Sequence, residues 1–344
     1  MDKIEITRPD DWHAHFRDGL VLSETVTASA QVFGRSVAMP NLTPPIVNAE
    51  MALAYRQRIL EERPAGSEFL PVVTLYLTNA TTPEEIRQAK TSGVLAAKLY
   101  PAGATTNSSQ GVNDITKMEP VFEAMAECQM LLLIHGEVTD REIDIFDREK
   151  VFIERHMQQI VERYPNLKIV FEHITTADAA VFVEEGPENL AATVTPQHLL
   201  LNRNDLLSGG IRPHYYCLPI LKRNTHQLKL REVVASGSHK FFLGTDSAPH
   251  MKHDKESSCG CAGCYSAPAA ICLYAQVFEE LGCLDKLEGF ASHYGADFYG
   301  LPRNTEKLTL VKESWQVPDE IQIGTGNSIV PFWAGNPILW RVLS

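Results

Sequence analysis

The sequence predicts an α/β fold, a (β/α)8 or TIM barrel with a C-terminal extension. Short apolar runs alternate along the chain with segments of helical spacing, and eight such units can be distinguished. The runs are apolar throughout, which is typical of parallel strands that are covered on both faces. A plain barrel of this type takes about 250 residues, so a chain of 344 residues has room for long loops. We expect a single domain over residues 1–344, with the residues after about 300 packing on the barrel as a tail.

The first strand is expected around Trp12, and seven further apolar runs follow it. They cover residues 37–39, 69–75, 94–97, 130–134, 169–171, 190–194 and 241–243. Helical signals lie between the runs. Thr82 to Glu85 form a capping box with proline at the first helical position, and residues 147–164 place apolar side chains on one helical face. A doubly wound open sheet is the alternative, but no Gly-rich dinucleotide fingerprint follows an early strand.

The balance of charge argues against a nucleic-acid partner. The chain has 31 Lys and Arg residues against 43 Asp and Glu residues, a formal net charge of −12, so nucleic-acid phosphates would meet an acidic surface. The first residues, MDKIEITRPD, are too polar for a signal peptide, and no apolar run approaches the roughly 20 residues that span a bilayer. We therefore expect a cytoplasmic protein with no membrane partner.

Seven cysteines are present, and three of them lie close together at Cys259, Cys261 and Cys264. An odd number in a long chain suits reduced thiols better than a disulfide framework. The spacing of the three lacks the second pair of a zinc ribbon. We interpret the segment as a tight loop near the functional site, and its role stays open.

Metal-binding residue types follow four of the apolar runs closely. They are Lys98, His135, His173 and Asp246. In a barrel, the carboxyl ends of the strands carry the active site. On the first strand, His13 and His15 are two residues apart and therefore share one face. The sequence thus predicts that six such side chains point into one cavity.

Four imidazoles and a carboxylate suit Zn²⁺ or a similar divalent ion. They are more ligands than one ion needs if a coordination position is to stay open, so two ions fit better. Lys98 is then the expected bridging ligand. An ammonium group beside two cations would be repelled, whereas a lysine carboxylated by carbon dioxide is an anion with two oxygens.

Each feature alone also has a plainer explanation. An HxH pair is more often two half-buried or surface histidines, a histidine after a strand usually bonds a backbone carbonyl, and Asp246 could cap a helix. These explanations would have to hold together at six positions on one face of the predicted barrel, so we favour the metal site. The remaining histidines are expected to be structural or surface residues: His156, His198, His214, His226, His239, His253 and His293.

Longer motifs extend the pattern over nearly the whole chain. They are DWHAHFRDG, AMPNLTPP, AAKLYPAGATTNS, LLIHGE, FEHITT, ATVTPQHL and FLGTDSAPH. With them the sequence resembles the amidohydrolase superfamily and, within it, the dihydroorotases of the shorter bacterial and fungal type. The resemblance runs from about residue 3 to about residue 340.

The resemblance implies a role for each candidate ligand. His13, His15 and Asp246 would bind the first metal ion, and His135 and His173 the second. Lys98, as N6-carboxylysine, would bridge the two ions. The implied cofactor is therefore a pair of Zn²⁺ or similar divalent ions per subunit.

The resemblance also implies a set of substrate contacts. The residues concerned are His15, Arg17, Asn41, His135, Leu218, His250 and Ala262. Arg17, Asn41 and His250 would hold the substrate carboxylate, for which the planar guanidinium group is well suited. Leu218 and Ala262 would contact the ring through backbone groups. Thr105 and Thr106 would belong to a mobile loop that closes over the substrate.

The implied activity is the reversible cyclisation of N-carbamoyl-L-aspartate to L-dihydroorotate in de novo pyrimidine biosynthesis, catalysed by a hydrolase that acts on cyclic amides. A hydroxide bridging the metal ions would attack the ring amide, and Asp246 would act as general acid and base. The resemblance further implies a homodimer. Two alternatives stay open: another cyclic-amide hydrolase, such as a hydantoinase, and a catalytically inactive scaffold on the same fold.

Overall fold

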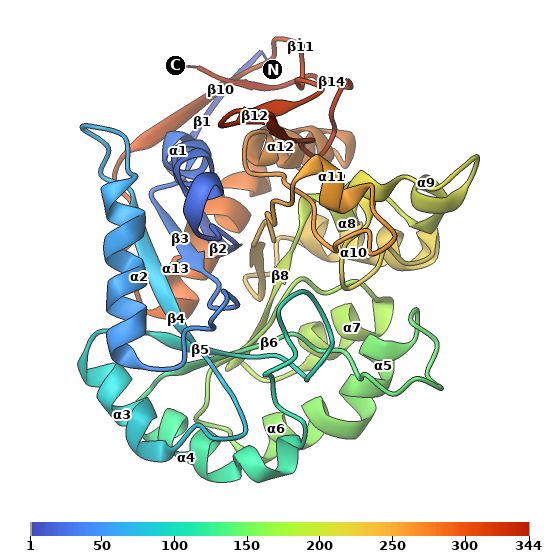
Figure 1. The fold of residues 1–344 in the computed structure, drawn as a ribbon. Helices are drawn as coiled ribbons and strands as arrows, with labels where there is room; N and C mark the ends of the chain where they lie inside the picture. The colour runs from blue at the N-terminus through green and yellow to red at the C-terminus, as the bar shows by residue number, and fades with distance from the viewer. Residues whose placement is uncertain (1, 344) are drawn as a thin grey trace.

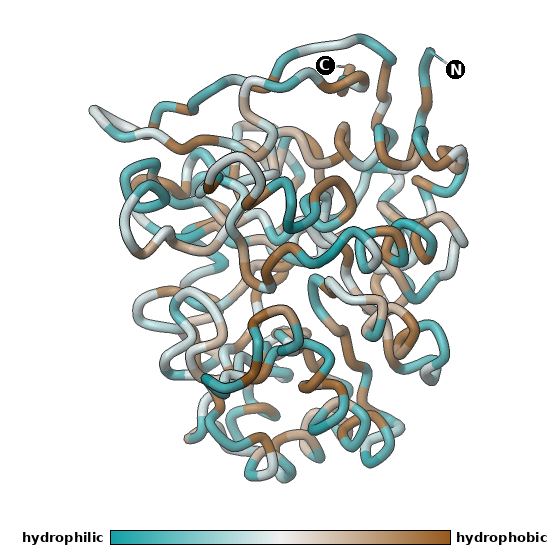
Figure 2. The backbone as a smooth tube through the Cα atoms, turned by 90° about the vertical axis from the view of Figure 1, so that its right-hand side faces the viewer, coloured by the Kyte–Doolittle hydropathy of each residue, from teal (hydrophilic) through white to brown (hydrophobic). Residues whose placement is uncertain are grey.

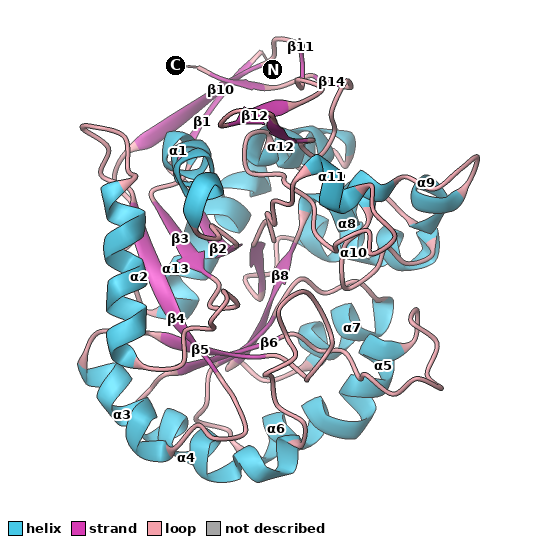
Figure 3. Cartoon of the chain, viewed as in Figure 1, coloured by secondary structure: helices cyan, strands magenta, loops and turns pink. Residues whose placement is uncertain are grey.

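The computed structural model describes residues 2–343 and contains an eight-stranded parallel sheet in the order β2-β3-β4-β5-β6-β7-β8-β9. The strands are β2 (Asp10–Ala14), β3 (Arg35–Ala38), β4 (Leu70–Tyr76), β5 (Ala96–Leu99), β6 (Leu131–Ile134), β7 (Ile169–Phe171), β8 (Leu190–Val194) and β9 (Phe241–Leu243). They surround the centre of the molecule, with helices outside them (Figures 1 and 3). The predicted barrel and its eight strands are confirmed, with shifts of one or two residues at the strand ends.

The barrel closes where the first of these strands meets the chain after the last. Asp246 N donates to His13 O at 2.9 Å, and His15 N donates to Ser247 O at 3.0 Å. Thr245 adds two bonds to the carboxylate of Asp11, from its backbone N at 2.9 Å and from its hydroxyl at 2.7 Å. This seam brings residues from the two ends of the barrel sequence together.

Helices follow the strands and cover the outside of the barrel, as the cyan ring in Figure 3 shows. They are α1 (Leu22–Val32), α2 (Ala49–Glu61), α3 (Pro83–Thr91), α4 (Glu119–Glu127), α5 (Arg148–Phe152), α6 (Gln158–Arg163), α7 (Ala177–Glu185), α8 (Pro196–Leu200), α9 (Arg203–Leu207), α10 (Asn224–Ser236), α11 (Lys252–Lys255), α12 (Ala270–Glu280) and α13 (Tyr294–Tyr299). Shorter 3₁₀ turns lie at Gly19–Val21, Ile115–Met118, Pro213–Tyr215 and Leu284–Lys286, and π turns at Ile153–Met157 and Gly289–His293. Along the tube of Figure 2, hydrophobic and hydrophilic stretches alternate, as expected of elements with one buried face.

Two of the predicted helices show how local sequence acts. Thr82 caps α3, since its hydroxyl accepts from Glu85 N while the Glu85 carboxylate accepts from Thr82 N at 2.8 Å, so the predicted capping box is confirmed. The predicted helical stretch 147–164 is helical but not a single α-helix. The π turn Ile153–Met157 separates α5 from α6 and shifts the buried face by one residue.

Aromatic rings and a glycine fill the barrel interior. Trp12 and Tyr299 pack with ring centroids 4.3 Å apart and ring planes tilted by 30°, and Phe242 lies edge-on to Trp12 at 6.3 Å. The α13 residue Gly295 lies so close that an added Cβ would come within 2.0 Å of Trp12 Nε1. A helix can therefore approach β2 at this point only with glycine there.

The tail forms small antiparallel sheets on one side of the barrel, near both chain ends in Figure 1. β1 (Lys3–Thr7) pairs with β10 (Lys307–Val311), which pairs with β15 (Arg341–Val342). β11 (Trp315–Gln316) pairs with β14 (Pro337–Ile338), and β12 (Ile321–Ile323) with β13 (Asn327–Ile329). Trp340 is fully buried and donates to Glu279 of α12 at 3.1 Å, which attaches the tail to the barrel. Within the described residues, no helix has the length and apolar character needed to cross a bilayer.

Candidate metal centre

Six side chains with metal-binding groups meet at the carboxyl ends of the barrel strands. In chain order they are His13 in β2, His15 just after it, Lys98 in β5, His135 after β6, His173 after β7 and Asp246 after β9. All six are buried, with no more than 8% of any residue exposed. Ionisable groups are rarely buried to this extent unless they are paired or bind a ligand.

His13, His15 and Asp246 form the tightest cluster. His15 Nε2 lies 3.0 Å and His13 Nε2 3.3 Å from Asp246 Oδ1, and the two Nε2 atoms are 3.3 Å apart. Burial raises the pKa of Asp246, but the His13 and His15 rings that contact its carboxylate outweigh this and hold the pKa well below its usual value. Within residues 2–343 this is the one group of three or more His, Cys, Asp or Glu residues whose ligand atoms lie within 4.8 Å of one another.

Lys98 and His173 lie beside this cluster and contain buried polar atoms without partners. The ring centroid of His173 is 4.9 Å from that of His13 and 4.8 Å from that of His135. Lys98 Nζ and His173 Nδ1 have no hydrogen-bond partner among the described residues, an arrangement that costs free energy unless something else binds them. Burial lowers the pKa of Lys98 to about 8 against the opposing effect of Glu172 and Asp246, so the neutral amine, which is the form that can add carbon dioxide, is more populated than in an exposed lysine. These atoms fit a metal pair bridged by a modified lysine.

Carboxylates behind the ligands fix which imidazole nitrogen faces the centre. His13 Nδ1 lies 2.8 Å from Glu172 Oε2, and His135 Nε2 lies 2.9 Å from Glu137 Oε2. A carboxylate accepts, so these two nitrogens carry the hydrogens. Nε2 of His13 and Nδ1 of His135 are left as lone-pair donors for a metal ion. Glu172 is itself held by the Thr193 hydroxyl at 2.6 Å.

Three residues of the candidate site have positive φ angles although they are not glycine. Arg17 has φ 63°, His173 has φ 41° and Asp246 has φ 46°. Such conformations cost of order 1–3 kcal/mol and persist where surrounding contacts determine them. His173 N donates to the Thr193 hydroxyl at 2.6 Å, and Asp246 N makes the bond to His13 O that closes the barrel. The chain therefore maintains backbone strain at the residues that face the centre.

Arg17 and His250 lie together at the edge of the cluster. Arg17 Nη2 is 3.3 Å from His250 Nε2, and His250 Nε2 is 2.9 Å from Ala262 O. Arg17 Nη1 is buried and has no partner within the described chain. A buried guanidinium nitrogen that still has hydrogens to donate is suited to an anionic ligand.

Asn41 connects the metal cluster with the 101–111 loop. Its Oδ1 accepts from His15 Nδ1 at 2.8 Å, and its Nδ2 donates to Thr106 O at 3.0 Å. The Thr106 hydroxyl donates in turn to Ala262 O at 3.2 Å. Thr105 turns within the loop, where its N donates to Ser108 Oγ at 2.9 Å. In this structure the loop therefore lies against the candidate site.

Leu218 has no hydrogen bond to any of the other expected substrate contacts among the described residues. It precedes Pro219 in a cis peptide and is half-buried against the core. The neighbouring carbonyl of Pro219 accepts from His198 Nε2 at 2.9 Å, so His198 is a buried structural residue, as expected. No hydrogen bond in the described chain joins Leu218 to Arg17 or His250.

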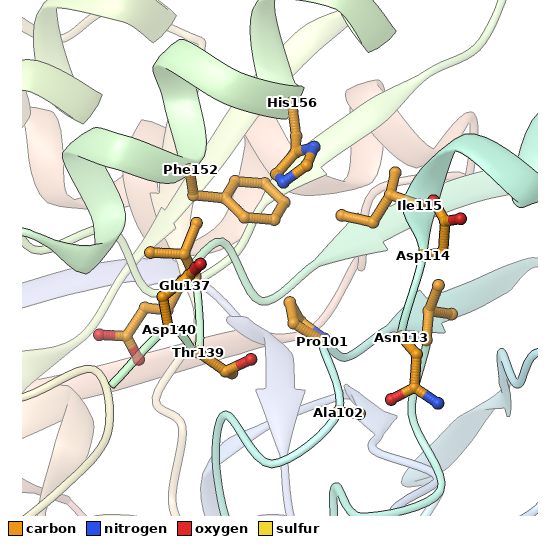
Figure 4. Close-up of a pocket in the computed structure, with 12 residues that line it drawn as sticks. Pro101, Ala102, Asn113, Asp114, Ile115, Glu137, Thr139, Asp140, Phe152 and His156 are labelled. Atoms are coloured by element: carbon orange, nitrogen blue, oxygen red, sulfur yellow. The ribbon is translucent and has the colours of Figure 1, made fainter. Parts of the chain in front are cut away.

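A cavity of about 170 Å³ lies behind the 101–111 loop. Figure 4 shows Phe152 and His156 on one side of it and Pro101 and Ile115 on the other. Glu137, which bonds His135, also lines the cavity. The cavity therefore lies between the base of the 101–111 loop and Glu137, the carboxylate that pairs with the candidate ligand His135.

Sequence reasoning missed three buried residues of this site. Glu137 and Glu172 pair with His135 and His13, and Tyr100 lies with its ring centre 5.2 Å from Lys98 Nζ. The Tyr100 hydroxyl is buried without a partner among the described residues. Strand parity could have identified two of them, because Glu137 and Tyr100 each lie two residues after a predicted ligand.

Comparison with known proteins agrees with this fold and identifies the family. The amidohydrolase family model matches residues 10–317. Dihydroorotase of Marinomonas sp. is 67% identical over 342 residues, covering 99% of this chain and 100% of that protein. The dihydroorotase of Saccharomyces cerevisiae in complex with 5-fluoroorotic acid superposes with a TM-score of 0.92 at 32% identity, covering 100% and 99% of the two chains. For dihydroorotase of Campylobacter jejuni the TM-score is 0.91 at 35% identity, with 100% and 98% covered.

Proposed function

The chain belongs to the amidohydrolase family and, within it, to the dihydroorotases, and from this premise we propose that it interconverts N-carbamoyl-L-aspartate and L-dihydroorotate through the six-residue centre. It is a hydrolase that acts on cyclic amides, and its relatives favour this activity over the hydantoinase alternative. The observation that carries the proposal is the convergence of six buried ligand-type side chains, two of which have polar atoms without partners.

The family implies the use of divalent metal; we propose two Zn²⁺ or similar ions. The ligands would be His13, His15 and Asp246 for one ion and His135 and His173 for the other, with carboxylated Lys98 between them. When bound, such a pair makes water a nucleophile at neutral pH and polarises the amide carbonyl.

The protein's own groups orient the substrate and transfer the proton. Arg17 donates to the substrate carboxylate from Nη1, with Asn41 and His250 beside it, so that the ring amide is directed toward Asp246. The Asp246 carboxylate takes a proton from the attacking water and returns it to the ring nitrogen as the amide bond breaks. In the direction of ring closure, the same carboxyl group begins protonated.

The other proposed contacts enclose the substrate. Backbone groups of Leu218 and Ala262 would contact the ring, with His15 and His135 beside the reacting carbonyl. Thr105 and Thr106 would close over it, and the hydrogen bond from Thr106 to Ala262 supports that role. Closure of this kind excludes bulk water and strengthens the electrostatic interactions inside the site. Homodimer formation and a cytoplasmic location stay predictions.

The test is the opening of dihydroorotate, followed by ultraviolet absorbance, in enzyme as purified, after chelation and after zinc is restored. We expect activity to disappear on chelation and to return with about two ions per chain. Asp246→Asn should remain folded and inactive. Metal-loaded protein that does not open dihydroorotate, or that opens hydantoin faster, would contradict the proposal.

A further inference from the structure

Lys255 is a buried lysine that the proposed mechanism does not use. It ends the four-residue helix α11, shown in orange in Figure 1, and only 3% of it is exposed. Its Nζ donates to three backbone carbonyls: Tyr216 O at 2.7 Å, Cys261 O at 2.8 Å and Gly263 O at 2.8 Å. Three acceptors around one nitrogen require three hydrogens, which an ammonium group has.

These three carbonyls belong to two segments far apart in the sequence. One segment contains Tyr216, and the other is residues 259–264, here called the cysteine loop. Gly263 N donates to Tyr216 O at 3.0 Å, so the segments also bond directly. Charge-assisted hydrogen bonds are about twice as strong as neutral ones, so Lys255 adds a strong connection between the two segments.

The cysteine loop has a backbone that needs such support. Cys261 has φ 22°, a strained value for a residue with a side chain. Gly263 has φ 151°, and a Cβ there would lie 2.7 Å from Ala248 O. Lys255 binds the carbonyls of these two residues, which flank Ala262.

Ala262 is the point at which the cysteine loop meets the candidate site. Its carbonyl accepts from His250 Nε2 at 2.9 Å and from the Thr106 hydroxyl at 3.2 Å. His250 lies beside Arg17, and Thr106 belongs to the 101–111 loop. A change in the position of Ala262 would therefore alter both the carboxylate-binding side and the closed loop.

A metal ion held by the cysteines would be an alternative way to order this loop. Cys259 Sγ and Cys261 Sγ are 3.9 Å apart, but Cys264 Sγ is directed to His214 O at 3.5 Å. The cysteines do not form a ligand cluster among the described residues. The Lys255 ammonium group already supplies the positive charge at this point.

We propose that Lys255 acts as an internal cation that fixes the cysteine loop and thereby sets the affinity of the enzyme for its substrate. Lys255 is a positioning residue, since it reaches the substrate only through Ala262, His250 and the 101–111 loop. The inference rests on the proposed function for its kinetic part. Its structural part, the ordering of residues 259–264 by an ammonium group, stands on the contacts alone.

The kinetic test compares Lys255→Met with Lys252→Met. Lys252 lies on the same helix and pairs with Glu320 at the surface, so its loss removes an ammonium group without affecting the cysteine loop. We expect Lys255→Met to raise KM for dihydroorotate about tenfold or more while kcat changes less than about threefold. Bound metal should stay at the wild-type level, and Lys252→Met should match wild type. An unchanged KM, or a fall in metal content, would overturn the proposal.

A second arm uses Lys255→Ala with methylammonium or propylammonium added to the buffer. A small cation that enters the vacated space can donate to the same carbonyls, so KM should fall toward the wild-type value as its concentration rises. Tetramethylammonium has no hydrogens to donate and is the matched control. If tetramethylammonium lowered the KM of Lys255→Ala as much as the alkylammonium ions do, the role of Lys255 as a hydrogen-bonding cation would be overturned.

Thiol labelling separates this inference from the proposed function. Cys264 is 1% exposed, so Ellman's reagent should modify it slowly in wild type, faster in Lys255→Ala and slowly again with propylammonium. Mass spectrometry identifies the labelled thiol. If wild type does not open dihydroorotate, the proposed function fails while this readout still tests the role of Lys255. Labelling of Cys264 that is equal in wild type and Lys255→Ala would overturn the inference itself.

Discussion

Arg17 and Lys98 are both basic residues at one site, but Arg17 is half-buried and Lys98 is fully buried. Arg17 retains a donor nitrogen without a partner at the edge of the cluster, whereas Lys98 Nζ lies among the imidazoles. Arg17 is therefore suited to bind an anionic substrate, and Lys98 to become a ligand. The difference leads to opposite kinetic signatures.

We predict that Arg17→Ala raises KM by about 100-fold and retains metal, because a buried charge-assisted bond contributes about 1.5–3 kcal/mol. Lys98→Ala should lose metal and activity together. Steady-state kinetics and metal analysis on the same preparations check both outcomes. Equal changes of KM and metal content in the two variants would contradict these assignments.

Glu172 holds His13 through the nitrogen that faces away from the centre. Glu172→Gln keeps the shape of the side chain but removes the charge, so the affinity for metal should fall about 10- to 100-fold. Glu137→Gln is the matched variant for His135, and we expect it to lower the affinity for the other ion, which His135 and His173 would bind. Competition with a chelator, with bound metal counted at each step, measures both affinities. Retention of both ions at wild-type affinity in either variant would show that these carboxylates do not orient the ligands.

At the scale of elements, seven of the eight barrel strands could be predicted from largely apolar runs, whereas the polar first strand, β2, was placed around Trp12. The end of such a run also indicated where Lys98, His135 and His173 would lie. Glu172 was missed because nothing in the local sequence shows that its side chain packs behind His13, a ligand on another strand. The tail strands of two or three residues were missed for a similar reason, since their pairing depends on segments far away in the sequence.

The contact between α13 and β2 provides a test of packing. Alanine normally stabilises a helix interior by about 1 kcal/mol relative to glycine. Gly295→Ala should instead destabilise the protein by about 2–3 kcal/mol, because the new Cβ would overlap Trp12. Urea unfolding of wild type and variant measures the difference in unfolding free energy. The dependence of that free energy on urea concentration should be the same in both proteins. If Gly295→Ala were more stable than wild type, α13 could move away from Trp12 without loss of unfolding free energy, and the prediction would be wrong.

At the scale of the whole molecule, Glu288 connects β1, the first strand of the chain, with β10, the first strand of the tail. Its Oε1 accepts from Thr7 N at 2.7 Å, from the Thr7 hydroxyl at 2.8 Å and from Lys307 Nζ at 3.1 Å. Burial raises the pKa of Glu288, but these bonds outweigh it and lower the pKa to about 2. A carboxylate with a lowered pKa stabilises the fold above its unfolded-state pKa and loses that effect as pH falls toward the folded value.

Glu288→Gln should therefore be less stable than wild type at pH 6 by about 1–2 kcal/mol, allowing for the partial exposure of Glu288. This difference in unfolding free energy should decrease as the pH falls from about 5 to about 2. Urea unfolding at several pH values checks this, and the difference between the two proteins removes the contribution of other titrating groups. A free-energy difference that stays constant over this pH range would show that it does not come from the ionised Glu288 carboxylate.

The seam between β2 and the segment after β9 has a consequence for synthesis of the protein. The proposed ligands of one ion come from residues 13, 15 and 246, so a nascent chain on the ribosome cannot complete this pocket until more than two thirds of it has been translated. If these residues bind metal as proposed, binding requires that β2 and the segment after β9 have already come together. Fragments released early by a premature stop codon would lack Asp246 and could not assemble this pocket.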